Sequence, residues 1–183
     1  FLDRLRAVTR ELGILLIFDE IVSFRLSMGG TQGAYEIDPD LTCLAKVIAG
    51  GTAGGAFGGR EDVMAPYDPT DGPPAIAQSG TYNGNPIATA AGLATLNTMT
   101  SEAYATLEGL TADLGAALEQ TFRSAGVKAC VVVAGSMFRI YFLAELPTNY
   151  RQAAADSKEK HRWLYFWMAN HGIAIRQGGA PSL

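Results

Sequence analysis

Apolar and polar positions along the chain recur with periods that predict helices and strands in turn. The first apolar residues follow helical spacing: Leu2, Leu5, Val8 and Leu12. Gly13 is placed to end this helix, and the apolar run 14–18 that follows predicts a buried strand. Asp19 closes that strand at its C-terminal end. The opening is therefore a helix–strand unit of an α/β fold.

Two more strands are expected before residue 60. The run 41–45 is a second strand candidate, separated from the first by a long glycine-containing connection. The small apolar run 56–59 is a third, where glycine pairs let a backbone or a ligand come close. Residues 61–75 carry four prolines and predict a surface loop.

In the second half of the chain the sequence pattern changes once, near residue 126, from helical to β-rich. Asn85 and Pro86 predict a helix start that leads to a helix ending near Met99, and a second amphipathic helix ends near Gly126. Beyond it the β-rich runs 128–133 and 137–142 predict a hairpin. A helix over about 157–170 and a strand 173–175 follow. We therefore expect one domain over residues 1–126 and an α+β domain over residues 127–183.

Composition narrows the class of protein. The chain has 183 residues, of which 48% are hydrophobic and 17% charged, as in globular proteins. A net charge of −4 without a basic run argues against nucleic acid as a partner. No apolar run approaches the roughly 18 residues that span a bilayer, so we expect no membrane partner. Cys43 and Cys130 lie in strand-like runs typical of buried reduced thiols, which favours a cytoplasmic location.

Asp19 and Lys46 form the most informative pair of residues. Each follows or closes an expected strand, and in an open α/β sheet ligands bind beyond the carboxyl ends of the strands. A carboxylate and an amine delivered there together suit pyridoxal 5′-phosphate. The amine can bind the cofactor covalently, and the acid can keep the pyridine nitrogen protonated. Taken singly, Asp19 is a common turn or cap residue, and Lys46 a common solvated side chain.

A third segment strengthens the same hypothesis. Residues 80–86 form a loop just before the helix that Asn85 and Pro86 predict. Gly80 and Gly84 allow a close backbone approach, and Thr81 offers a hydroxyl and an amide. This combination suits a phosphate group. No pairing of His or Cys at metal-ligand spacing occurs in the sequence, and we expect no metal site.

A family resemblance rests on a set of short motifs in one order. They comprise residues 16–21, 23–25, 29–33, 39–42, 46–48, 55–60 and 80–86, with a fainter match at 135–138. The set resembles the class III pyridoxal phosphate-dependent aminotransferases, especially the branch that includes glutamate-1-semialdehyde aminomutase. One departure is the run 49–55, where the family usually has Gly-Gly-Gly-x-Pro-Val-Gly. Its missing proline predicts a more mobile loop.

The resemblance implies a fold and roles for four residues. Residues 1–126 would be part of the large domain of fold type I, a mostly parallel sheet with helices, and 127–183 part of the C-terminal small domain. Asp19 resembles the partner of the pyridine nitrogen, and Lys46 the lysine that binds the cofactor. Thr81, beside Gly80, resembles the threonine that reaches the cofactor phosphate of the neighbouring subunit. The implied assembly is a homodimer with a shared active site.

The resemblance also implies the reaction. We expect an aminotransferase that moves an amino group between a small amine or amino acid and a carbonyl acceptor. A glutamate-1-semialdehyde 2,1-aminomutase, which transfers the amino group within one molecule, is the alternative. A non-catalytic subunit with the same fold is a second alternative. Because the chain opens at Phe1 inside a helix, we expect a piece of a longer protein, truncated at both ends, without the main phosphate-binding loop.

Overall fold

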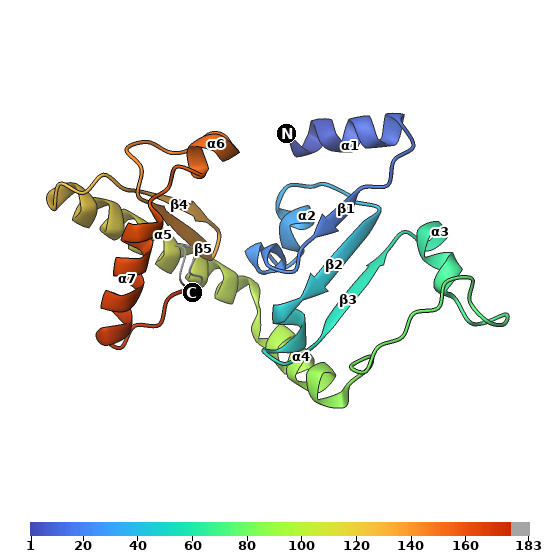
Figure 1. Ribbon diagram of the computed structural model, residues 1–183. Helices are drawn as coiled ribbons and strands as arrows, with labels where there is room; N and C mark the ends of the chain where they lie inside the picture. Colours follow the sequence, from blue (N-terminus) through green and yellow to red (C-terminus); the bar gives the residue numbers. More distant parts are fainter. Residues whose placement is uncertain (177–183) are drawn as a thin grey trace. The chain divides into compact units, whose positions relative to one another are not determined.

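The computed structural model describes residues 1–176 of the chain, and two compact units divide it (Figure 1). The first unit is Phe1–Ser101, and the second begins at Glu102. The first unit is an α/β arrangement around a small sheet. The second is a helix–hairpin–helix arrangement.

The sheet of the first unit has three strands in the order β1-β2-β3. They are β1 (Ile17–Asp19), β2 (Leu41–Ala45) and β3 (Gly55–Gly59). β1 and β2 are parallel, with Asp19 opposite Cys43, whereas β2 and β3 are antiparallel. All three lie where the apolar runs predict strands. The direction of β3 makes the described sheet mixed, not uniformly parallel.

Helices and helical turns connect and flank these strands. They are α1 (Leu2–Glu11), η1 (Ser23–Leu26), α2 (Gly30–Ala34), η2 (Lys46–Ala49), α3 (Glu61–Met64), η3 (Ala65–Tyr67) and α4 (Pro86–Thr98). α1 ends as predicted, because Gly13 has a φ of +64° and its amide donates to the carbonyl of Arg10. α4 begins as predicted, because the Asn85 side chain accepts from the amides of Ile87 and Ala88.

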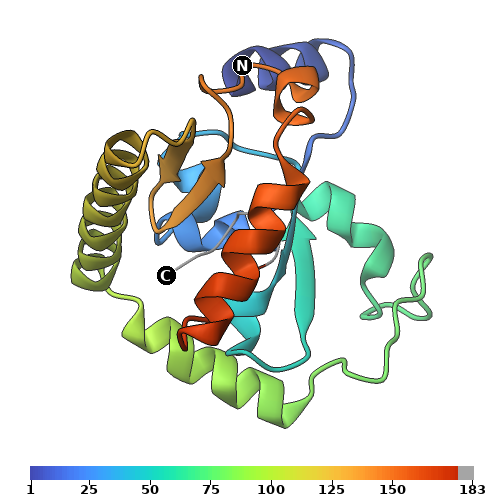
Figure 2. The ribbon, with the colours of Figure 1, turned by 60° about the vertical axis from the view of Figure 1, so that its left-hand side comes forward.

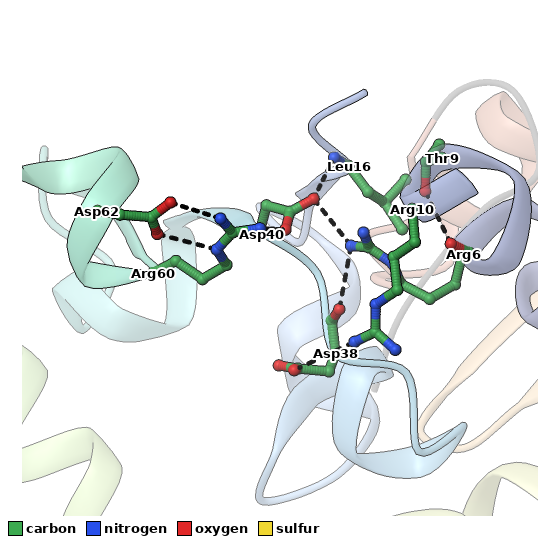
Figure 3. A network of polar contacts seen from close by, with 8 residues as sticks. All are labelled: Arg6, Thr9, Arg10, Leu16, Asp38, Asp40, Arg60 and Asp62. Carbon is green, nitrogen blue, oxygen red and sulfur yellow. Dashed lines mark hydrogen bonds and ion pairs between the residues drawn. The ribbon is translucent and has the colours of Figure 1, made fainter. Parts of the chain in front are cut away.

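A buried carboxylate joins the N-terminal ends of β1 and β2 to the C-terminal end of β3 (Figure 3). Asp40 is 3% exposed and precedes β2. Its Oδ2 accepts from the Leu16 amide at 2.7 Å and from Arg6 Nη1 at 2.8 Å. Its Oδ1 accepts from Arg60, which follows β3. The Leu16 amide and the Arg6 guanidinium hold the pKa of this carboxyl well below its usual range. Asp40 thereby ties α1 to all three strands.

The second unit packs helices against a two-stranded hairpin (Figure 2). It contains α5 (Ser101–Ser124), β4 (Cys130–Ala134), β5 (Met137–Tyr141), α6 (Tyr150–Ala153) and α7 (Lys158–Asn170). Val131, Phe138 and Ile140 form its buried centre. Partly buried side chains from α5, from the residue after β5 and from α7 cover that centre: Leu114, Leu118, Phe122, Phe142 and Leu164. α5 packs on the hairpin, and the compact units divide at its first residue, between Ser101 and Glu102. The domain boundary expected near residue 126 stays a prediction.

Three local expectations are wrong. β1 is shorter than the apolar run 14–18, and Ile14, Leu15 and Ile17 are 53%, 48% and 53% exposed, because β1 has a strand neighbour only on the β2 side. The proline-containing stretch after β3 is not loop throughout, since it begins with α3 and η3. Within residues 1–176, residues 173–175 have no strand partner and form no strand.

Candidate active site

The carboxyl ends of the two parallel strands hold Asp19 and Lys46. Asp19 is the last residue of β1, and Lys46 follows the last residue of β2 directly. The register pairs Asp19 with Cys43, and Lys46 comes three residues after Cys43, just beyond the end of β2. Because β1 and β2 run in the same direction, both residues lie at the same end of the two strands. The two residues on which the cofactor hypothesis depends therefore lie at the same end of two neighbouring strands.

Lys46 has a backbone conformation that L-residues rarely adopt. Its φ is +54°, in the left-handed region, which costs a non-glycine residue roughly 1–2 kcal/mol. The turn η2 begins at this residue and is followed by Gly50, whose φ is +58° and whose amide donates to the carbonyl of Val47. Strain of this kind persists only where surrounding contacts impose it, and such positions cluster at functional sites.

Helix α4 supplies those contacts. A Cβ built on Gly92 of α4 would lie 2.0 Å from the carbonyl oxygen of Ile48 in η2. A Cβ on Gly50 would lie 2.4 Å from the backbone of Ala91. Figure 1 shows α4 lying against the end of β2, where η2 is. The turn that presents Lys46 is therefore held by backbone-to-backbone packing that only glycine permits at these two positions.

Asp19 is oriented by its own chain. Its Oδ1 accepts from the amide of Ile21 at 3.1 Å, and its side chain is exposed. Burial of Asp19, which the strand pattern suggests, does not occur, because β1 is an edge strand of the described sheet. An exposed and oriented carboxylate is able to accept a hydrogen bond from a ligand at this edge. The amine and the carboxylate thus fit the covalent and the ring-nitrogen contacts of pyridoxal phosphate.

The Gly80–Thr81 segment lies between η3 and α4 in the chain. Both residues are exposed, in the turn that precedes α4. The amide of Asn83 donates to the carbonyl of Gly80 at 3.0 Å, which closes the turn. A pocket of about 480 Å³ lies between this turn and β3, and its lining includes Phe57, Asn83 and Gly84. The Thr81 hydroxyl is thus presented on a closed, exposed turn beside the start of β3, where Gly55 pairs with Ala45, the residue before Lys46.

Glu20, the residue directly after Asp19, also belongs to the site region. Strand alternation places it on the opposite side from Asp19, and it is 1% exposed. Its carboxylate accepts from the amides of Thr31 and Gln32 at the start of α2. The glycine-rich sequence of α2 does not look helical, so no local signal pointed to this contact.

Two kinds of site receive no support from the described residues. Within residues 1–176, no group of three or more His, Cys, Asp or Glu side chains is arranged to hold a metal ion. Over the same residues, no helix combines the length and the apolarity that crossing a bilayer requires.

Comparisons with known proteins agree on one family. The family described as Aminotransferase class-III matches residues 1–182. Glutamate-1-semialdehyde 2,1-aminomutase of Syntrophus aciditrophicus is 43% identical over all of this chain and 41% of its own length. The crystal structure of an omega-transaminase from Sphaerobacter thermophilus is 37% identical, with a TM-score of 0.93 over all of this chain and 42% of that one.

A further solved structure bears on the cofactor. A transaminase with pyridoxal phosphate bound is 32% identical, with a TM-score of 0.87 over all of this chain and 42% of that one. The chain thus spans about two fifths of the length of these relatives. The family resemblance carried by the sequence motifs is confirmed, and so is pyridoxal 5′-phosphate as the cofactor expected from that family.

Proposed function

Because this chain belongs to the class III aminotransferase family, we propose that it is part of a pyridoxal phosphate-dependent aminotransferase. The reaction moves an amino group between a small amine or amino acid and a carbonyl acceptor. The observation that carries the proposal is the position of Asp19 and Lys46 at the carboxyl ends of two adjacent parallel strands. Sheets of this kind bind their ligands there.

Lys46 is the proposed catalytic residue. When bound, pyridoxal phosphate supplies an electron sink for negative charge on the substrate carbon. Lys46 Nζ would hold the cofactor covalently and, once released by the incoming amine, would accept and return the proton of the substrate carbon. This requires the amine to point from a fixed turn, and the packing of η2 on α4 supplies that fixed turn.

Asp19 is the proposed partner of the pyridine nitrogen. A carboxylate there keeps that nitrogen protonated, so that the ring can accept electrons. The Ile21 amide holds one carboxylate oxygen and leaves the other free to receive the pyridine N–H. Because β1 and β2 are neighbours, a cofactor ring bound at the exposed end of β1 would also lie near the end of β2, which Lys46 follows.

Thr81 and Gly80 are the proposed phosphate contacts. The closed turn before α4 presents the Thr81 hydroxyl, and glycine at position 80 admits a close approach. Following the family resemblance, we assign this contact to the cofactor of a second subunit. The protein would then be a homodimer with a shared active site, in the cytoplasm, with residues 127–183 as part of its small C-terminal domain.

A second candidate function is supported by one observation. The relative at 43% identity is a glutamate-1-semialdehyde 2,1-aminomutase, and this similarity supports the aminomutase reaction as the second candidate. The residues proposed above serve both reactions equally, because both need the covalent amine and the protonated ring. A non-catalytic subunit is disfavoured, since it has no use for the Asp19–Lys46 pair.

One experiment separates these three functions. The purified full-length protein is loaded with pyridoxal phosphate and incubated with amino donors, with and without a panel of keto acids and aldehydes, and the products are identified. An aminotransferase forms product only when an acceptor is present. An aminomutase isomerises glutamate-1-semialdehyde without an acceptor. A protein that does neither would overturn the proposed function.

The matched variants are Lys46→Ala and Lys128→Ala. Lys128 is an exposed lysine in the second unit, outside the proposed site. Lys46→Ala should abolish turnover with little loss of stability, because an exposed lysine contributes little packing. Lys128→Ala should leave turnover unchanged. Equal turnover in the two variants would exclude Lys46 as the catalytic amine.

A further inference from the structure

Glu20 is an acidic residue buried beside the proposed site, with no role in the reaction described above. It is 1% exposed, and together with Thr111 it is the largest fully buried side chain in the described residues. A buried carboxylate is costly to desolvate unless several donors compensate it. Its contacts therefore show what the residue holds in place.

The side chain of Glu20 is held by the start of α2. Oε1 accepts from the amide of Gln32 at 2.9 Å, and Oε2 accepts from the amide of Thr31. These first-turn amides have no partner within the helix, so the carboxylate satisfies them. A Cβ on Gly30 would lie 2.7 Å from Oε2, and the φ of Gly30 is +70°, so glycine is what lets the carboxylate reach.

The main chain of Glu20 is also held, by two backbone hydrogen bonds. Its amide donates to the carbonyl of Cys43 at 2.9 Å, which extends the pairing of β1 with β2 beyond Asp19. Its carbonyl accepts from the amide of Phe24, within η1. Glu20 is therefore tied to β2, to η1 and to α2. α2 is in turn tied to β2, because Gln32 Nε2 donates to Thr42 Oγ1 at 3.2 Å.

The neighbouring carboxylate depends on this attachment. Asp19 Oδ1 accepts from the Ile21 amide, so the direction of the Asp19 carboxylate follows the orientation of the peptide between Glu20 and Ile21. We propose that Glu20 is a positioning residue, whose buried carboxylate fixes that peptide and thereby aims Asp19 relative to Lys46. The proposal rests on the proposed function, because it assigns Asp19 to the cofactor ring.

The test uses Glu20→Gln in the full-length protein. Glutamine keeps the shape of the side chain but turns an NH₂ group towards one of the α2 amides, which leaves two donors facing each other. The control is Asp40→Asn, an equivalent change of a buried carboxylate at the opposite end of the same strands. A purely structural role for Glu20 would give both variants the same behaviour.

Three readouts are compared between the variants: the Tm of the cofactor-free protein, kcat with KM, and the pH midpoint of the visible absorption change of the bound cofactor. We expect both variants to have a lower Tm. Glu20→Gln alone should lower kcat by about tenfold or more, since misplacement of a catalytic group by 1 Å can cost roughly a hundredfold. It should also shift the pH midpoint in the direction that Asp19→Asn shifts it.

The possible outcomes are distinct. A Glu20→Gln protein with a lower Tm but the parent's kcat and pH midpoint would overturn the positioning role. If Asp19→Asn itself leaves kcat and the midpoint unchanged, the proposed function has failed at Asp19, and the inference fails with it. Where Glu20→Gln does not fold, Glu20→Asp decides the question, because it keeps the charge but shortens the reach to α2. A parent-like midpoint in Glu20→Asp would refute the proposal.

Discussion

Asp40→Asn tests how far one buried carboxylate holds the first unit together (Figure 3). Asp40 and Arg6 are buried partners, with side chains 4% and 8% exposed and 2.8 Å between Oδ2 and Nη1. Asparagine keeps an acceptor for the Leu16 amide but removes the charge that compensates Arg6. Arg6 is then a buried cation without its anion, and this is the source of the expected loss.

The magnitude follows from that uncompensated charge. Removing one partner of a buried ion pair costs about 3–5 kcal/mol, and the retained acceptor places the expected loss near the lower value. For a protein of this size each kcal/mol corresponds to about 2–4 °C in Tm. We therefore expect Asp40→Asn to lower Tm by roughly 10 °C at neutral pH.

The loss should depend on pH in a defined direction. Because the folded protein lowers the pKa of Asp40, its contribution to stability is present above the pKa of the unfolded chain, about 3.9. The contribution is lost as the pH falls below that value towards the folded pKa. The difference between parent and variant should therefore be constant from neutral pH to about 5 and shrink below about 4.

Thermal and urea unfolding at a series of pH values measure this difference. The control is Asp38→Asn, where an exposed aspartate faces the exposed Arg10 at 3.6 Å. Exposed pairs contribute about 0–1 kcal/mol, so the control should shift Tm by only a few degrees. An Asp40→Asn variant no less stable than the Asp38→Asn control would refute the reasoning. So would a difference that grows as the pH falls.

Three further variants test the proposed site. Asp19→Asn should retain the cofactor but slow turnover by about a hundredfold or more, because a preorganised charge opposite the ring is lost; a rate within tenfold of the parent would exclude the role. Thr81→Ala should speed cofactor release, measured by dilution, without changing the product, whereas Thr106→Ala on α5 should change neither. Gly92→Ala should displace η2, since its Cβ would lie 2.0 Å from the Ile48 carbonyl, and so reduce covalent cofactor attachment. Ala90→Gly, at an exposed position of α4, should lower stability but keep attachment, and equal attachment in both would refute the packing argument.

Short sequence signals at the helix ends were enough to predict where α4 begins and where α1 ends. The start of α4 follows from Asn85 and Pro86, whose capping geometry needs no distant residue. The end of α1 at Gly13 is equally local. The strand ends that carry Asp19 and Lys46 could also be placed, because an apolar run and the residue after it are visible in the sequence.

Features that depend on distant partners could not be predicted. The exposure of β1 depends on which strands flank it, and the direction of β3 depends on the turn at 50–54, neither of which an apolar run encodes. Asp40 gains its role from Arg6, 34 residues earlier, and Glu20 from an α2 that lacks a helical pattern. The expected strand at 173–175 has the right composition but no partner in the described structure.

Covalent mapping of the cofactor identifies the lysine that binds it. The full-length protein is loaded with pyridoxal phosphate, reduced with borohydride, digested and analysed by mass spectrometry. The chain offers four lysines for comparison: Lys46, Lys128, Lys158 and Lys160. We expect the reduced cofactor on Lys46 and its loss in Lys46→Ala. Attachment at another lysine, or unchanged attachment in Lys46→Ala, would contradict it.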